Sequence, residues 1–375
     1  MHDRSWLNKV KWDPRLADGS FFPSDLNIPS GARIALVRMG TGTPESERDV
    51  LETVQSKAHD PAFWPSLSGL PRALAAKVLT HWYRAPLKRA VERVGTGTSY
   101  RRLLQEQCSM IARLVNEALG DRAVVKPYVV MRHGSPHIER LNAELIADGI
   151  THILLMPVGT LHSVVGSGSA LLLFSALQRR GALPNLPTAV LPDVGKTEGY
   201  RKALNERIDE GLQRFPRSQR HEVALLFVRH QDPIGIRYQH AESRQRLASL
   251  PAWIMEKRSK ERTFDEAPIN YFGYQDWIDL VPLAQLRELY KAGNRSALIV
   301  PVGMTVDHLE SAYFLEILLK ERADWLGYDR LEIAAPLNCH ATFLETIASL
   351  VLKSLGQETP VGVAVKDAAD MVVSS

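Results

Sequence analysis

Cysteine is scarce in this chain, since Cys108 and Cys339 are its only two among 375 residues. Two cysteines cannot form a disulfide framework, a four-cysteine zinc site or an all-cysteine iron–sulfur cluster. We therefore expect no iron–sulfur cluster. Such sparing use of cysteine is typical of a reducing compartment, so we expect a cytoplasmic protein.

Long hydrophobic runs are missing as well. A helix needs about 18 consecutive apolar residues to cross a bilayer, and the sequence contains no such run. The first residues, MHDRSWLNKVKWDP, also lack the apolar segment of a signal peptide. We expect neither a membrane-spanning helix nor a secretory signal.

Charge of one sign is not in large excess. Lysine and arginine number 46 against 42 aspartates and glutamates, a net charge of +4. With no long basic run, this balance does not favour nucleic acid as a partner. Six basic residues could form either a contact with the surface of an anionic membrane or a solvated face: Arg84, Lys88, Arg89, Arg93, Arg101 and Arg102. The oligomeric state stays open.

Apolar segments of strand length alternate with segments of helical pattern. The predicted strands are 32–38, 124–131, 153–158, 187–191, 222–228, 269–274, 297–302 and 331–335. Strands that are apolar throughout indicate parallel sheets covered by helices on both faces. We predict an α/β protein with two Rossmann-like domains whose parallel sheets face each other across a cleft. Residues 58–100 show a less regular pattern.

The order of these segments predicts the domain boundaries. Residues 1–31, with several prolines and aromatic residues, are expected to form an N-terminal arm. The first α/β domain is predicted to comprise 32–188 together with 336–356, and the second 189–335. A weakly patterned tail, 357–375, follows.

Two predicted strand ends carry side chains suited to chemistry. The seventh predicted strand runs through a glycine-containing turn into a helix, with Asp307, His308 and Glu310 at the turn. Such strand ends are where open α/β sheets bind ligands. The alternative is a capping box, in which Asp307 and Glu310 satisfy amides at the helix start. His230 follows the fifth predicted strand and is either a functional group that titrates near neutral pH or a structural histidine.

Six segments, in this order, resemble motifs of the ferrochelatase family, whose members insert ferrous iron into a porphyrin. They are 33–44, 84–99, 130–136, 155–169, 225–233 and 300–311. The last, VPVGMTVDHLES, is the most specific. The resemblance runs from about residue 33 to residue 352 and implies a chelatase-like two-domain fold.

The resemblance also implies a lyase of haem and porphyrin biosynthesis, with Fe(II) as the substrate metal and a porphyrin or haem as the partner. His230 stands where relatives have an essential histidine, and Glu310 where they have the carboxylate opposite, so both are expected to be catalytic residues and metal ligands. Asp307 and His308 match the same motif and are candidates to orient them. Metal insertion removes two pyrrole protons, which a neutral imidazole can accept, while a carboxylate can bind the cation.

Other positions depart from the family pattern. Relatives usually have tyrosine and proline in the loop at 158–162, and the segment around 275–279 is shortened here. In that loop His162 is either an added ligand or a residue facing water, and Ser163 is a candidate substrate contact.

Arg229 and Trp277 are further candidate substrate contacts. Arg229 could pair with a propionate or, as we slightly favour, with Asp232. Trp277 either contacts the porphyrin or packs in the core.

Three functions fit these observations: a ferrochelatase, a divergent homologue that uses the same cleft for another metal or substrate, and a non-catalytic haem- or porphyrin-binding protein. The His230 and Glu310 pair favours an enzyme, because binding alone does not need a proton acceptor opposite a carboxylate. The altered loops favour the other two.

Overall fold

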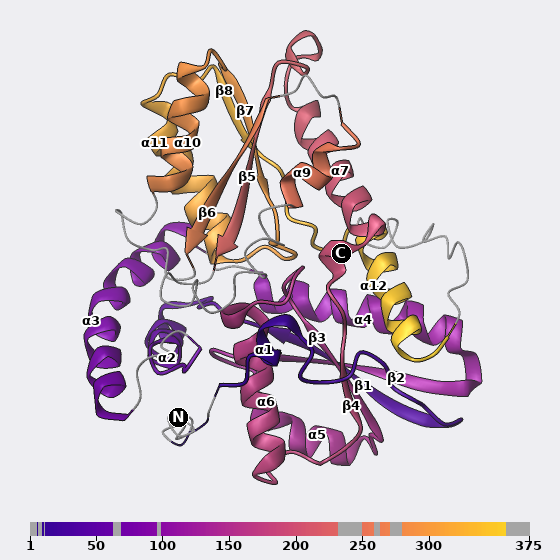
Figure 1. The fold of residues 1–375 in the computed structure, drawn as a ribbon. Coiled ribbons are helices and arrows are strands. Elements are labelled where there is room, and N and C mark those ends of the chain that lie inside the picture. Colours follow the sequence, from indigo (N-terminus) through magenta and orange to yellow (C-terminus); the bar gives the residue numbers. More distant parts are fainter. Residues whose placement is uncertain are drawn as a thin grey trace.

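The computed structural model describes residues 6, 10, 12–62, 69–95, 99–231, 250–258, 263–270 and 280–357. Within them the chain builds two four-stranded sheets with helices packed around them (Figure 1). All pairs of neighbouring strands are parallel. The predicted α/β class with two parallel sheets is confirmed.

The first sheet has the strand order β2-β1-β3-β4. Its strands are β1 (Ala32–Gly40), β2 (Ala123–Met131), β3 (His152–Pro157) and β4 (Thr188–Val190). One face packs against α5 (Leu141–Ala147) and α6 (Ser169–Arg179). The other packs against α4 (Tyr100–Leu119) and α12 (Ala341–Ser354). Burial on both faces explains why the strands are apolar throughout.

The second sheet repeats this topology in the order β6-β5-β7-β8. Its strands are β5 (Ala224–Gln231), β6 (Phe264–Asn270), β7 (Ser296–Pro301) and β8 (Arg330–Ile333). The helices of this half are α7 (Glu198–Gln213), α9 (Leu250–Met255), α10 (Leu280–Lys291), the π-helix η8 (Glu310–Leu319) and α11 (Lys320–Asp324). Strand β6 begins about five residues before the predicted strand 269–274.

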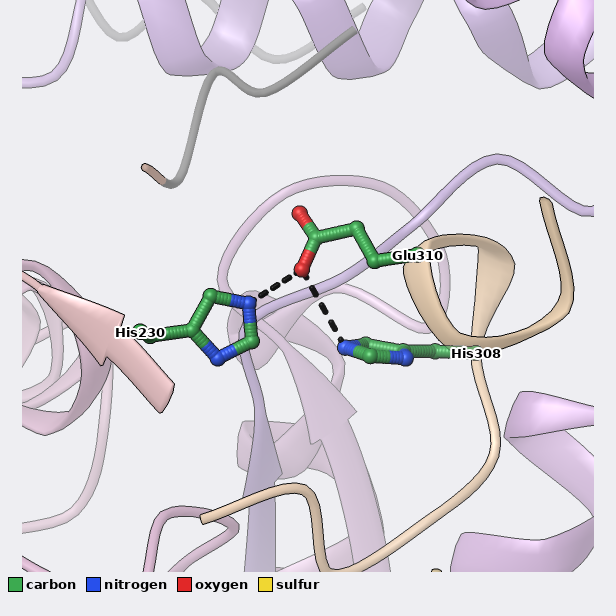
Figure 2. A group of neighbouring side chains, drawn as sticks. All are labelled: His230, His308 and Glu310. Atoms are coloured by element: carbon green, nitrogen blue, oxygen red, sulfur yellow. Dashed lines mark hydrogen bonds and ion pairs between the residues drawn. The ribbon is translucent and has the colours of Figure 1, made fainter. Parts of the chain in front are cut away.

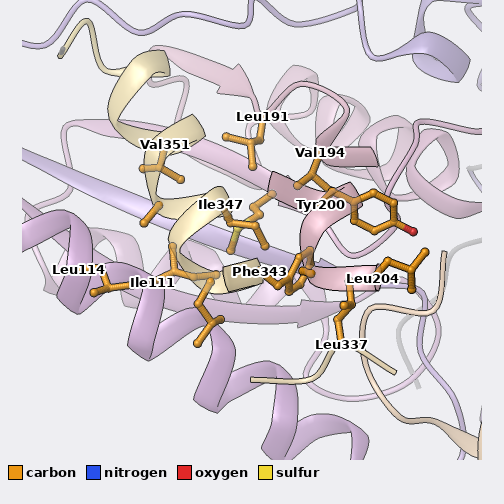
Figure 3. Close-up of a cluster of buried hydrophobic side chains, with 14 of the residues drawn as sticks. Ile111, Leu114, Leu191, Val194, Tyr200, Leu204, Leu337, Phe343, Ile347 and Val351 are labelled. Carbon is orange, nitrogen blue, oxygen red and sulfur yellow. The ribbon is translucent and has the colours of Figure 1, made fainter. Parts of the chain in front are cut away.

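One apolar cluster joins the two halves. It includes Leu36 of β1 and Leu225 of β5. Helix α12 contacts both α4 of the first half and α7 of the second. Figure 3 shows Phe343 and Ile347 of α12 close to Tyr200 of α7. Because these side chains leave water together, their burial stabilises the two sheets as one packed unit. The domain boundaries given above stay a prediction.

Two short helices precede the long α3. Helix α1 (Arg15–Asp18) lies in the N-terminal arm, and Leu16 in it is fully buried. Helix α2 (Glu47–Ala58) begins with a capping box, in which the side chains of Ser46 and Asp49 bond each other's backbone amides. Single turns complete the described structure: η2 (Gly120–Arg122), η3 (Ile138–Arg140), η4 (Val164–Gly168), η5 (Val194–Lys196) and η6 (Arg217–Gln219).

Helix α3 (Gly69–Val94) occupies much of the stretch whose sequence pattern is irregular. Leu74, Val78 and Trp82 are exposed on it, so its apolar residues do not mark one buried face. Pro86 lies inside it, a residue that usually ends a helix. Neither α3 nor any other described helix combines the length and the apolar character needed to cross a membrane.

Candidate active site

The second sheet brings two of the predicted residues together at its topological switch point. Strands β5 and β7 are neighbours, and the chain proceeds from β5 to one side and from β7 to the other. At such a point the loops after the two strands part and leave room for a ligand. His230 lies near the end of β5, and Glu310 opens η8 after β7.

Three side chains meet there (Figure 2). His230 Nε2 contacts Glu310 Oε2, and His308 Nε2 lies 3.3 Å from the same oxygen. The two imidazole rings are 5.8 Å apart at an interplanar angle of 84°. One ligand atom from each residue falls within 4.8 Å of the others, a spacing that a metal ion could bridge. Imidazole nitrogen and carboxylate oxygen are donors that suit iron.

The Glu310 carboxylate is buried, with its side chain 10% exposed. Burial on its own would raise the pKa of Glu310, because a low-dielectric setting disfavours the charged form. The charge and hydrogen bond of His230, followed by the hydrogen bond of His308, outweigh burial and hold the pKa of Glu310 well below its ordinary value of 4.5. Glu310 is therefore ionised at neutral pH and can meet a cation without first losing a proton.

The local backbone sets the orientation of His308. The amide of Ser311 donates to His308 Nδ1 at 3.3 Å, and the amide of His308 donates to Ser311 Oγ at 3.0 Å. Since Nδ1 accepts, the proton of the neutral ring is on Nε2, which faces Glu310. His308 thus donates to the carboxylate in its neutral form. The reciprocal pair also caps the helix, as a capping box does.

Asp307 does not form the cap that its spacing to Glu310 suggests. Its carboxylate accepts from Asn338 Nδ2 at 2.7 Å and from Ser311 Oγ at 3.0 Å. Asn338 Oδ1 in turn accepts from the amide of Asp307 at 2.8 Å. Asn338 has a φ of 46°, a conformation that asparagine tolerates better than most residues. Asp307 therefore fixes the loop before η8 to the segment before α12.

The first half of the chain also holds this loop. Gln107 Nε2 on α4 donates to Thr305 O at 3.0 Å. Thr305 Oγ1 donates to Val158 O, after β3, at 2.7 Å. These buried contacts were missed at the sequence level, because residues about 150 to 200 positions apart give no local pattern.

The loop after β3 contains His162 and Ser163, both buried. His162 Nε2 donates to Leu191 O at 3.0 Å, and its Nδ1 lies 3.1 Å from Ser167 Oγ. Ser163 Oγ accepts from the Gly166 amide at 3.0 Å and so caps η4. Both His162 nitrogens thus have protein partners, and contact of either residue with substrate stays a prediction.

Arg229 points away from His230, because neighbouring residues of a strand face opposite sides. Its Nε lies 3.3 Å from Glu266 Oε2 on β6, a partner that the sequence did not indicate. The other partner considered, Asp232, and the candidate contact Trp277 lie outside the described residues.

A buried polar cluster in the first half went unnoticed in the sequence. The Asp60 carboxylate contacts Arg132 Nη2 at 3.1 Å, His133 Nε2 at 3.3 Å and the Ser169 hydroxyl. Burial and the Arg132 charge lower the pKa of His133 to about 3, so this histidine stays neutral. The cluster ties the segment after α2 to the ends of β2 and α6.

Several known proteins are similar to this chain over most of its length. The ferrochelatase of Gloeobacter violaceus is 27% identical over 330 residues, which are 87% of this chain and 98% of that protein. The ferrochelatase of Synechococcus elongatus is 25% identical over 87% of this chain and 83% of its own. Among solved structures, SirB from Bacillus subtilis with Fe3+ aligns with a TM-score of 0.49 at 10% identity, covering 86% of this chain and 96% of its own. The ferrochelatase family model matches residues 33–355, and with the match extending over most of its length this chain belongs to the ferrochelatase family.

Proposed function

We propose that this protein inserts Fe(II) into a porphyrin at His230 and Glu310. As a member of the ferrochelatase family it is a lyase of the metal-chelatase kind. The observation that most supports the assignment to these residues is the meeting of His230, His308 and Glu310 at the switch point of the second sheet.

Glu310 receives the metal in this proposal. Its ionised carboxylate offers a hard oxygen donor to the substrate Fe(II) as the ion sheds water. His308 keeps its Nε2 proton directed at Oε2 and so holds the carboxylate in one orientation. A fixed ligand loses less entropy when the ion arrives.

His230 removes protons from the porphyrin in this proposal. Insertion of the metal breaks two pyrrole N–H bonds, and each electron pair left on nitrogen then binds the ion. In this proposal the His230 imidazole accepts such a proton, as a general base does. Since His230 Nε2 contacts Glu310, the proton can leave along that contact.

An anaerobic metallation assay tests this function. We expect the full-length protein, mixed with protoporphyrin IX and Fe(II), to convert the porphyrin spectrum into that of haem in the Soret and Q bands. Parallel reactions with Co(II), Ni(II) and Zn(II) separate a ferrochelatase from a chelatase for another metal. Tight porphyrin or haem binding without metallation by any of these ions would instead show a binding protein.

We further propose that the protein works in the cytoplasm and rests on an anionic membrane through α3. Leu74, Val78 and Trp82 are 54%, 55% and 62% exposed and recur every four residues, so they share one face. Lys77 and Arg84 on the same helix supply positive charge beside this face. An apolar stripe flanked by cations is the pattern of a helix that lies on a lipid surface.

Sedimentation with lipid vesicles tests the membrane contact. We expect binding to vesicles that contain phosphatidylserine, weaker binding to pure phosphatidylcholine, and loss of binding in Trp82→Ser with Val78→Ser. Binding that is unchanged in this double variant would refute α3 as the contact.

A further inference from the structure

Arg38 is a buried cation of the first half that the chemistry described so far does not use. It lies on β1 and is 2% exposed. Burial lowers the pKa of Arg38 to about 10, which still leaves the guanidinium charged at neutral pH. Within the described part of the chain, no carboxylate pairs with it. A buried charge without a counter-ion is costly, so the hydrogen bonds of Arg38 have to offset that cost.

These hydrogen bonds go to neutral acceptors on three separate segments. Nη1 donates to Pro157 O, at the end of β3, at 2.9 Å. Nη2 donates to Gln107 Oε1 on α4 at 3.0 Å and to Thr305 Oγ1 at 3.4 Å. Gln107 and Thr305 are as fully buried as Arg38. Because Thr305 lies in the loop that leads to Glu310, Arg38 connects β1 of the first half with the active-site loop of the second.

Arg38 determines which way the side-chain amide of Gln107 points. A guanidinium can only donate, so Gln107 turns its carbonyl oxygen toward Arg38. The amide nitrogen then faces the other way and donates to Thr305 O at 3.0 Å and to Asn338 O at 2.5 Å. These carbonyls belong to the two segments that Asp307 joins. Without the guanidinium, nothing in this network keeps the Gln107 nitrogen on the side of the two carbonyls.

The hydroxyl of Thr305 is oriented in the same way. Its oxygen accepts from Arg38 Nη2, so its proton is left to donate to Val158 O at 2.7 Å. Both the backbone carbonyl and the side chain of Thr305 are therefore held by the first half of the chain. A loop held at these points keeps the metal ligands that follow it in one arrangement, which lowers the entropy lost when an ion binds.

We propose that Arg38 is a positioning residue of the metal site, which holds the loop before η8 through Gln107 and Thr305. The inference rests on the proposed function, which brings the substrate metal to Glu310. Loss of a residue that orients metal ligands weakens metal binding by about 10- to 100-fold. Lysine is a poor substitute, because a compact ammonium lacks the planar fork that reaches several acceptors at once.

Binding of Co(II), measured without porphyrin, tests this role. The full-length protein is titrated with Co(II), and the visible absorption of the bound ion is followed. We expect Arg38→Met to raise the dissociation constant at least about tenfold, and Arg38→Lys to raise it less. Adding Thr305→Val to Arg38→Met should cost little more than Arg38→Met alone, because both changes break one network.

Val37→Ala is the matched control for a general loss of stability. Val37 neighbours Arg38 on β1, is equally buried and packs in the cluster on the opposite face of the sheet. The variant should lower the urea midpoint of unfolding and leave the Co(II) dissociation constant within about twofold of wild type, as expected of a site outside the network.

The possible outcomes separate the two proposals. Unchanged Co(II) affinity in a folded Arg38→Met overturns the role of Arg38, as does an equal loss of affinity in Val37→Ala. Thr305→Val alone, with the same outcomes, replaces Arg38→Met should the latter fail to fold. Weaker Co(II) binding in Arg38→Met, together with a wild-type protein that metallates no porphyrin, supports Arg38 and refutes the chelatase function. A wild-type protein that binds no Co(II) refutes both.

Discussion

The two halves of the molecule have the same sheet topology but different polar groups at their switch points. Each sheet has its first and third strands as neighbours, and each third strand leads into a π-helix, η4 after β3 and η8 after β7. In the first half, the histidine at this place, His162, bonds Leu191 O and Ser167. In the second half, the histidines bond a carboxylate.

The difference lies in what the polar groups face. The His162 ring satisfies a backbone carbonyl, so it stabilises the loop after β3 and has little capacity left for a ligand. Glu310 gathers two imidazoles around one oxygen, and a divalent ion can take the place of their protons. The same topology thus offers two switch points, and our proposal assigns the chemistry to the second because of the side chains that follow its strands.

The largest effect is expected from Glu310→Gln and His230→Ala. Each removes a group that in our proposal binds the metal or moves a proton, and such groups contribute about 10²- to 10⁴-fold to a rate. We expect the single-turnover rate of Fe(II) insertion to fall by that factor, with porphyrin binding retained. Metallation at the wild-type rate in either variant would contradict the assignment of the chemistry to the second half.

A smaller loss is expected from His308→Ala. His308 orients the Glu310 carboxylate through its Nε2 proton, and loss of a residue that orients a metal ligand costs about 10- to 100-fold in affinity or activity. The concentration of Fe(II) that gives half the maximal rate should rise. An equal loss for His308→Ala and Glu310→Gln would instead make His308 a direct participant.

In the first half, His162→Gln should affect stability more than rate. Loss of buried hydrogen bonds costs about 1–3 kcal/mol, which should appear as a lower free energy of unfolding in urea. The metallation rate of the folded variant should stay within about threefold of wild type. A normal free energy of unfolding with weakened porphyrin binding would assign His162 to substrate contact and bring the two halves closer in function.

The mildest effect is one of pH on stability. Because the pKa of Glu310 is lowered in the folded protein, its contribution to stability is complete above its ordinary pKa of 4.5 and is lost as the pH falls toward the lowered value. The difference in free energy of unfolding between wild type and Glu310→Gln should therefore shrink below about pH 4.5. A difference that does not change with pH would argue against the ionised, imidazole-bound carboxylate.

The sequence predicted the sheets better than the loops that hold the site. Seven of the eight strands lie within three residues of their predicted bounds, because segments such as 297–302 are apolar on both faces. The eighth, β6, was misplaced because Asp265 and Glu266 interrupt the apolar pattern. Helix α3 was missed because its apolar residues do not mark one buried face.

The site was predictable only where residues follow strands. His230 and Glu310 come after strands that are neighbours in the sheet, so the topology brings them together. Asn338 and Gln107 reach the loop before η8 through tertiary packing alone, and no spacing along the chain marks them. The helix is capped by His308 with Ser311 and not by Asp307. This also depends on side-chain rotamers, which a pattern of residues does not specify.

The most direct test of the contrast between the two switch points is the position of a bound metal. A crystal of the full-length protein soaked in Co(II) would be measured at the cobalt absorption edge, where anomalous scattering locates the ion. We predict a peak at bonding distance, about 2.0–2.2 Å, from Glu310 Oε2 and His230 Nε2. A peak at His162, with none at Glu310, would contradict the account.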